Sequence, residues 1–138
     1  MSVMQILQPP GWAKAKGFSN GIAAQGRLVF IAGQVGWTGQ GEWQETSFAG
    51  QFRQALQNIV EVLDQAKGKP EHIVRLTWYI LDKKEYLGAR KEVGAAYREL
   101  MGRHYPTMAV VQVSALVEDQ ARLEIEATAV IPESGHES

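Results

Sequence analysis

The sequence contains no cysteine, no long apolar run and no cluster of basic residues, and each absence excludes a class of protein. Without cysteine there is no disulfide, no thiolate nucleophile and no cysteine–zinc site, so a reducing cytoplasm is the simplest location. No apolar stretch approaches the roughly 20 residues that span a membrane. Residues 1–17 lack the basic start and the uninterrupted apolar core of a secretory signal. We therefore expect a cytoplasmic protein without a membrane partner.

Basic and acidic side chains are nearly balanced, with a formal net charge of −1, and the lysines and arginines are scattered. A nucleic-acid-binding protein usually carries a basic stripe that neutralises phosphates, so a nucleic-acid partner is not expected. The three histidines, His72, His104 and His136, stand far apart and none has a second histidine four residues away. We expect no metal site and no cofactor.

The chain has the length and composition of one globular domain, residues 1–138, with an ordered core over about 17–132. Apolar periodicity predicts a helix that begins after Thr46 or Ser47 and ends near Gly68, where a left-handed residue is expected. A second helix is predicted over residues 84–102, weakened by two glycines. The strands are predicted at 5–7, 19–24, 27–34, 73–81 and, in two pieces, within 106–132.

This order of elements predicts an α+β fold with a five- or six-stranded sheet, because two helices cover only one face of such a sheet. Residues 27–34 are apolar on both faces, as in a central strand. Alternate positions of 29–32, 74–80 and 109–113 are apolar and predict that the uncovered face is apolar too. A large apolar face in a soluble protein implies a partner surface, and closed homo-oligomers are the usual solution. We expect subunits that pack sheet against sheet, with clefts between them.

The most chemically suggestive pattern is the strictly alternating strand that follows the turn at Pro106. Glu124 and Glu126 point to the same side of it, because side chains alternate between the two faces of a strand. Two carboxylates on one face are candidates for acid–base chemistry. The alternative is that both are solvated residues on an exposed sheet face, and the spacing alone leaves both open.

A resemblance to a known family rests on four segments that occur in order: LVFIAGQVG, QFRQALQNIVEVL, HIVRLTWYILDKKEY and YPTMAVVQVSALVEDQARLEIEATAV. They resemble the RidA/YjgF family, also called endoribonuclease L-PSP, over about residues 17–131. The resemblance implies a chorismate-mutase-like fold of the bacillus type and a homotrimer with a central barrel. It also implies that small molecules bind in clefts between the subunits. Active members hydrolyse reactive enamines and imines, made by pyridoxal-phosphate enzymes, to a keto acid and ammonia.

The resemblance also implies the site. Glu124 matches the family glutamate that positions a water for attack on the imine carbon, and we expect it to be catalytic. An arginine usually follows the turn proline by two residues and binds the substrate carboxylate, but that position holds Met108. The position of an N-terminal tyrosine holds Phe18. The expected ligand-binding residues are Phe18, Ala32, Gly33, Gln34, Met108 and Arg103.

The loss of that arginine changes the expected ligand. An arginine binds a carboxylate through two charge-assisted hydrogen bonds, whereas methionine offers a polarisable apolar surface and no donor. The site should therefore bind small 2-imino acids poorly and prefer apolar or aromatic ligands. Arg103 or Arg90 would replace the missing cation if either reaches the cleft; otherwise both are surface charges.

Three functions remain open. The first is a hydrolytic imine and enamine deaminase of altered specificity, and the second is a non-catalytic small-molecule-binding trimer. The third is an endoribonuclease or translation inhibitor, ranked last because the chain has neither a basic stripe nor a histidine pair for phosphodiester cleavage.

Overall fold

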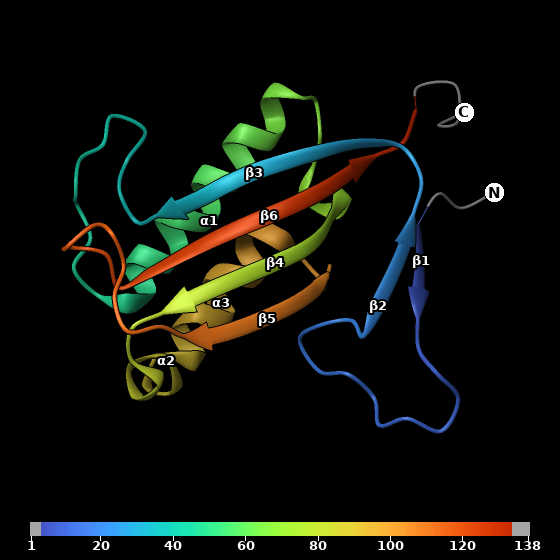
Figure 1. Cartoon of the computed structure of the whole chain (residues 1–138), viewed down its shortest axis with the longest axis horizontal. Coiled ribbons are helices and arrows are strands. Elements are labelled where there is room, and N and C mark those ends of the chain that lie inside the picture. Colours follow the sequence, from blue (N-terminus) through green and yellow to red (C-terminus); the bar gives the residue numbers. More distant parts are fainter. Residues whose placement is uncertain (1–3, 134–138) are drawn as a thin grey trace.

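The computed structural model describes residues 4–133, so His136 lies outside the described part of the chain. The elements, shown in Figure 1, are β1 (Met4–Leu7), β2 (Gly21–Ala24), β3 (Arg27–Val35), α1 (Phe48–Gln65), η1 (Pro70–His72), β4 (Ile73–Ile80), α2 (Lys83–Gly88), α3 (Arg90–Met101), β5 (Thr107–Gln112) and β6 (Leu123–Ile131). Among residues 4–133, none of the helices is both long and apolar enough to cross a lipid bilayer.

The main sheet has four strands in the order β3-β6-β4-β5, and it is mixed, because β5 runs parallel to β4 while the other pairs are antiparallel. Helices α1 and α3 cover one face, and within the described residues no helix lies on the other (Figure 1). The predicted α+β class is confirmed. The prediction of a central strand over 27–34 is wrong, since β3 is an edge strand of this sheet. Its apolar outer side stays exposed, at 58% for Leu28 and 74% for Phe30.

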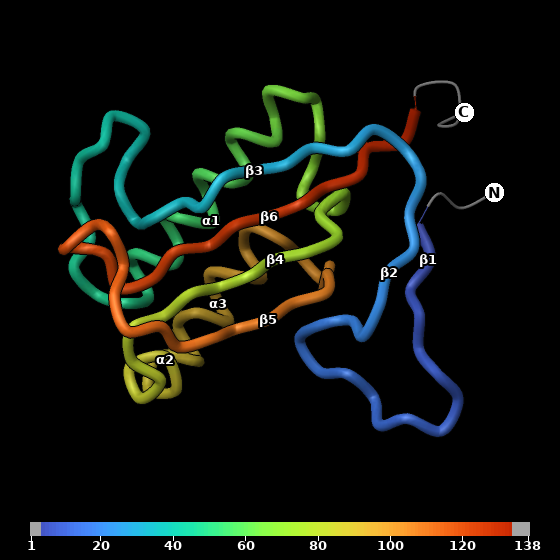
Figure 2. Tube along the Cα trace, viewed as in Figure 1, coloured from blue at the N-terminus to red at the C-terminus, as the bar shows by residue number. Residues whose placement is uncertain are grey.

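Strands β1 and β2 form a separate two-stranded sheet, so the six strands do not share the single sheet that the pattern predicts. Figure 2 shows the chain turning sharply between β2 and β3. Gly26 lies at this turn with φ 148°, and a Cβ there would overlap the carbonyl of Ile131. Ser19 ties this pair of strands to the start of β5. Its N–H donates to the Pro106 carbonyl at 3.1 Å, and its hydroxyl donates to the Tyr105 carbonyl at 2.5 Å.

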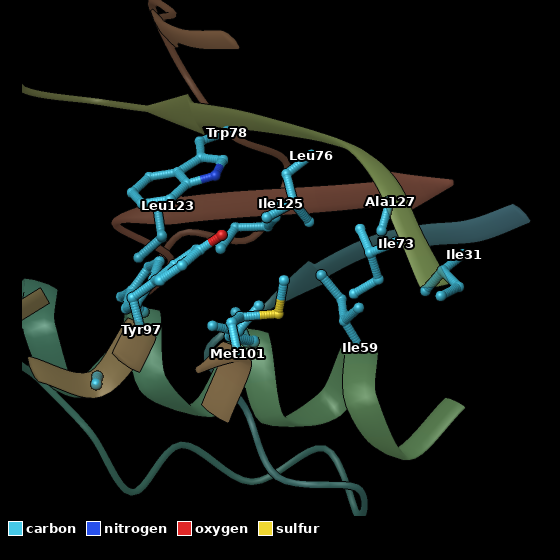
Figure 3. Packing of buried hydrophobic residues seen from close by; sticks show 14 of the residues in the cluster. Ile31, Ile59, Ile73, Leu76, Trp78, Tyr97, Met101, Leu123, Ile125 and Ala127 are labelled. Atoms are coloured by element: carbon cyan, nitrogen blue, oxygen red, sulfur yellow. The ribbon is translucent and has the colours of Figure 1, made fainter. Parts of the chain in front are cut away.

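The hydrophobic core fills the space between the main sheet and the two helices (Figure 3). The predicted alternation of the last strand is confirmed, because Leu123, Ile125 and Ala127 face this core. Ser47 is the predicted N-cap of α1, and its hydroxyl accepts from the Gly50 N–H at 3.0 Å. The left-handed residue after α1 is Lys67, not Gly68. Gly68 is instead packed where a Cβ would meet the side chains of Leu63 and Ile131.

The predicted second helix is broken in two at Ala89. The side chain of Asp82 caps α2 by accepting from the Lys84 N–H at 2.9 Å. Ala89 leaves the helical region, with φ −107° and ψ 10°, and α3 starts afresh at the next residue. The chain therefore forms two short helices, α2 and α3, where one was predicted.

Two polar side chains of α1, Gln51 and Asn58, are buried, and both hold loops in place. The Gln51 amide donates to the Gln120 carbonyl at 2.9 Å and accepts from the Arg122 N–H at 2.8 Å. The Asn58 amide donates to the Trp37 carbonyl at 2.7 Å. The two residues therefore fix the end of β3 and the start of β6.

Candidate functional site

A cavity of about 350 Å³ opens between β5 and α3, and we call it the aromatic pocket. Its aromatic and apolar walls are made by Phe18, Trp78, Tyr86, Val93, Tyr97, Tyr105, Met108 and Val110, and the remaining lining residues are Lys16, Gly17, Arg90, Gly94 and Arg98. Cavities of this size and lining are typical of small-molecule sites.

The register of β5 explains why Met108 lines this pocket. Met108 lies opposite Leu76 of β4, and Val110 lies opposite Trp78, so both point to the helix-covered face. Phe18 reaches the pocket because its neighbour Ser19 is hydrogen-bonded to the turn before β5. The structure therefore brings two of the predicted ligand-binding residues, Met108 and Phe18, together.

The wall formed by Tyr97 and Tyr105 is held rigidly. Their rings stack with centroids 5.6 Å apart and an interplanar angle of 3°. The Tyr97 hydroxyl donates to the His104 carbonyl at 2.6 Å, and Nε2 of His104 hydrogen-bonds the Ile73 carbonyl at 2.6 Å. Burial, with a smaller contribution from Tyr105, raises the pKa of Tyr97 far above its ordinary value. The hydroxyl therefore stays protonated at neutral pH and keeps its hydrogen bond.

The predicted catalytic residue lies elsewhere, on the open face of the sheet. Glu124 and Glu126 of β6 lie opposite Tyr79 and Thr77 of β4, and we call Tyr79, Glu124 and Glu126 the carboxylate cluster. The Tyr79 hydroxyl donates to Oε1 of Glu126 at 2.5 Å, and this hydrogen bond is the main reason that the pKa of Tyr79 is raised. The Glu126 carboxylate thus has a fixed partner, whereas the Glu124 carboxylate has no hydrogen bond or ion pair among residues 4–133.

A β-bulge in β3 lies against Glu124. The pairing of β3 with β6 shifts by one residue between Ile31 and Gln34, which places Ala32 and Gly33 in the bulge. A Cβ at Gly33 would overlap the Glu124 carboxylate, so the absence of a side chain is what makes room for it. The Gln34 amide donates to the Ala32 carbonyl at 3.2 Å. Bulges commonly redirect side chains next to functional sites.

The structure divides the predicted site residues between two faces of the sheet. Met108 points to the helix-covered face and Glu124 to the open face, so one chain does not place them in one cleft. Arg103 does not line the aromatic pocket either. It borders a neighbouring hollow, beyond Phe18 and Tyr105, together with Trp12. The alternation within β6 was readable in the sequence, but the facing of β5 was not, because residues 109–111 are apolar on both sides.

Sequence reasoning missed two further features of these sites. The first is that Arg98 lines the aromatic pocket beside Arg90. Their spacing of eight residues, with Gly94 halfway, could have indicated that both lie on one side of the helix, because positions four apart share one side. The second is the polarity of the open face, since β4 turns Arg75, Thr77 and Tyr79 outward where apolar residues were predicted.

Within residues 4–133, no three His, Asp or Glu side chains come close enough together to hold a metal ion.

Comparison with known proteins gives one consistent family. The family model "Endoribonuclease L-PSP" matches residues 11–131. A RutC family protein of Pyrococcus horikoshii is 32% identical over 113 residues, which cover 81% of this chain and 85% of the relative. The structure of a Rid family protein of unknown function from Yersinia pestis is similar, with a TM-score of 0.80, 29% identity and coverage of 94% of this chain and 100% of that one. The yjgF gene product of E. coli is 28% identical, with a TM-score of 0.65 and coverage of 76% and 81%.

Proposed function

The chain belongs to the endoribonuclease L-PSP family, which includes RidA and YjgF, and we propose that it hydrolyses reactive enamines and imines with an apolar or aromatic body. The observation that carries this proposal is the position of Glu124. Its carboxylate lies against the glycine of a β-bulge, on an accessible sheet face, with no partner in the described chain that would neutralise it. A free carboxylate at such a place is suited to accept a proton from water.

The proposal includes a homotrimer, because one chain keeps Glu124 and the aromatic pocket on opposite faces. We propose that the subunits pack through the open face and the edges of the sheet, so that Glu124 of one copy borders the aromatic pocket of the next. Exposed apolar side chains on the edge strands support this packing, namely Leu28, Phe30 and Val111. A closed ring of identical subunits then completes three equivalent sites.

In the proposed reaction Glu124 takes a proton from a water molecule while the water oxygen forms a bond to the imine carbon. The same proton is then delivered to the nitrogen, which gives a carbinolamine. Glu124 next passes the proton of the carbinolamine hydroxyl to the nitrogen while the carbon–nitrogen bond breaks, so that a carbonyl compound and ammonia leave. An enamine enters this path after it takes a proton on carbon and becomes an imine. Met108 and the aromatic walls hold the apolar body of the substrate and exclude water from around it. No cofactor takes part in these steps.

The test is ammonia release from imines generated in place by an amino-acid oxidase, from phenylalanine for an aromatic substrate and from alanine for a small one. We expect faster release from the phenylalanine imine, and loss of the acceleration in Glu124→Gln. Glu71→Gln removes an exposed carboxylate of η1 that belongs to neither the aromatic pocket nor the carboxylate cluster, and serves as the matched control. Full turnover in Glu124→Gln would show that Glu124 is not the base.

A non-catalytic binding trimer is the second candidate, and Met108 is the observation that favours it. Absence of acceleration with every imine, together with a saturable increase in melting temperature on ligand addition, would support the binding function instead. Met108→Arg separates the two, because it introduces the donor that small 2-imino acids require. Hydrolysis of the alanine imine by this variant would show that the remaining groups are catalytically competent.

A further inference from the structure

The aromatic pocket has an unbalanced charge. Three of its lining residues are cationic, Lys16, Arg90 and Arg98, and no acidic residue lines it. A neutral apolar ligand would make no charge-assisted contact with three cationic side chains that line an apolar cavity. The charge therefore indicates an anionic group on the ligand.

Arg90, Gly94 and Arg98 follow one another at intervals of four residues, along the side of α3 that borders the pocket. Gly94 is unusual in the middle of a helix, where it is among the least favourable residues. A Cβ at Gly94 would stand 3.3 Å from Nη1 of Arg98, closer than most carbon contacts. The guanidinium of Arg98 therefore lies back over the helix in space that glycine leaves free.

Neither guanidinium is engaged elsewhere in the described chain. Within residues 4–133, the guanidinium groups of Arg90 and Arg98 make no ion pair and no hydrogen bond, whereas Arg53 pairs with Glu99 and Arg122 pairs with Glu85. Two unpaired arginines of one helix, both bordering one cavity, are available to a ligand.

We infer that the pocket binds a carboxylate with an aromatic or bulky apolar body, and that Arg90 and Arg98 of α3 bind its acid group. This inference rests on the proposed function and deepens it, because it names the cation that takes over from the missing arginine at position 108. The acid group lies toward α3, and the body packs on Met108 and on the stacked rings of Tyr97 and Tyr105. A planar carboxylate suits guanidinium groups, which donate in a fixed fork.

The experiment measures equilibrium binding to the full-length protein by calorimetry, with phenylacetate, phenylacetamide and acetate as probes. Phenylacetamide has the same ring and shape as phenylacetate without the charge, and acetate has the charge without the ring. We expect phenylacetate to bind about 10- to 100-fold more tightly than phenylacetamide, as for a hydrogen-bonded charge, and more tightly than acetate. Equal affinity for the acid and the amide, or no binding of the acid, would overturn the inference.

The variants Arg90→Gln and Arg98→Gln test the residues themselves. Each should weaken phenylacetate binding about 10-fold or more and leave phenylacetamide binding unchanged. Lys91→Gln removes an exposed charge of the same helix that does not line the pocket, so it is the matched control. If Arg90→Gln and Arg98→Gln behave like Lys91→Gln, the inference is wrong.

Binding and turnover also separate this inference from the proposed function. Arginine-dependent binding of phenylacetate without any imine hydrolysis would refute the proposed reaction and keep the carboxylate site. Hydrolysis that depends on Glu124, with phenylacetate binding that does not depend on either arginine, would support the proposed reaction and refute the carboxylate site.

Discussion

Gly33→Ala provides the sharpest test of the role of Glu124, because it moves the carboxylate without removing it. A methyl carbon at Gly33 would stand 2.8 Å from Cδ and 3.0 Å from Cγ of Glu124, whereas carbon atoms in contact prefer about 3.5 to 4.0 Å. The side chain must therefore shift by about 1 Å, and a misplacement of this size in a catalytic group can lower the rate about 100-fold. We expect kcat for imine hydrolysis to fall by about that factor.

The same substitution should hardly change the stability of the protein. Gly33 does not occupy the left-handed region, so alanine fits its backbone. The displaced group is the end of a flexible, half-buried side chain, so the free energy of unfolding in urea should change by less than about 1 kcal/mol. Gly39→Ala is the matched control, since a Cβ at Gly39 meets open space. Wild-type kcat in Gly33→Ala, with the fold intact, would refute the role assigned to Glu124.

Three further substitutions test other features. Gly94→Ala should raise the free energy of unfolding by up to about 1 kcal/mol and weaken phenylacetate binding. Gly88→Ala is the control, because a Cβ at Gly88 meets open space and should leave binding unchanged. Unchanged binding in Gly94→Ala would contradict the position assigned to the Arg98 guanidinium. Gln51→Ala should lower the free energy of unfolding in urea by about 2–4 kcal/mol, because the Arg122 N–H and the Gln120 carbonyl lose their partner. Gln57→Ala, at an exposed position of the same helix, should lower it by less than about 0.5 kcal/mol. Equal losses in the two variants would contradict the role of Gln51. Burial raises the pKa of Tyr97, so the unfolded chain loses the hydroxyl proton first, at about pH 10. The free energy of unfolding should therefore fall as the pH rises from about 9 to 11. Tyr97→Phe should make this fall less steep, and the same slope in both proteins would refute the prediction.

The parts of the fold that the sequence predicted well are those where one face is buried and the other is not. The alternation from Leu123 to Ile131 and the apolar stripe of α1 each define a face without further information. The β5 segment has no such contrast, so the opposite facing of Met108 and Glu124 depends on how β5 pairs with β4, which lies between β5 and β6.

The candidate site was predictable in its residue types and not in its arrangement. Gln51 and Asn58, seven residues apart within the apolar stripe of α1, could have been recognised as buried hydrogen-bonding residues. Gly94 reads in the sequence only as a weak point of a helix, and its role depends on where the Arg98 guanidinium lies. Tertiary contacts of this kind have no local signal.

The location of the two arginines has a consequence for how this scaffold can diversify. They are exposed residues on the side of α3 that borders the aromatic pocket, away from the strand pairing and from the fully buried residues of α1. Substitutions there exchange the chemical preference of the cavity while the framework keeps its geometry. Related chains can therefore acquire different ligands through changes at two positions about two helical turns apart.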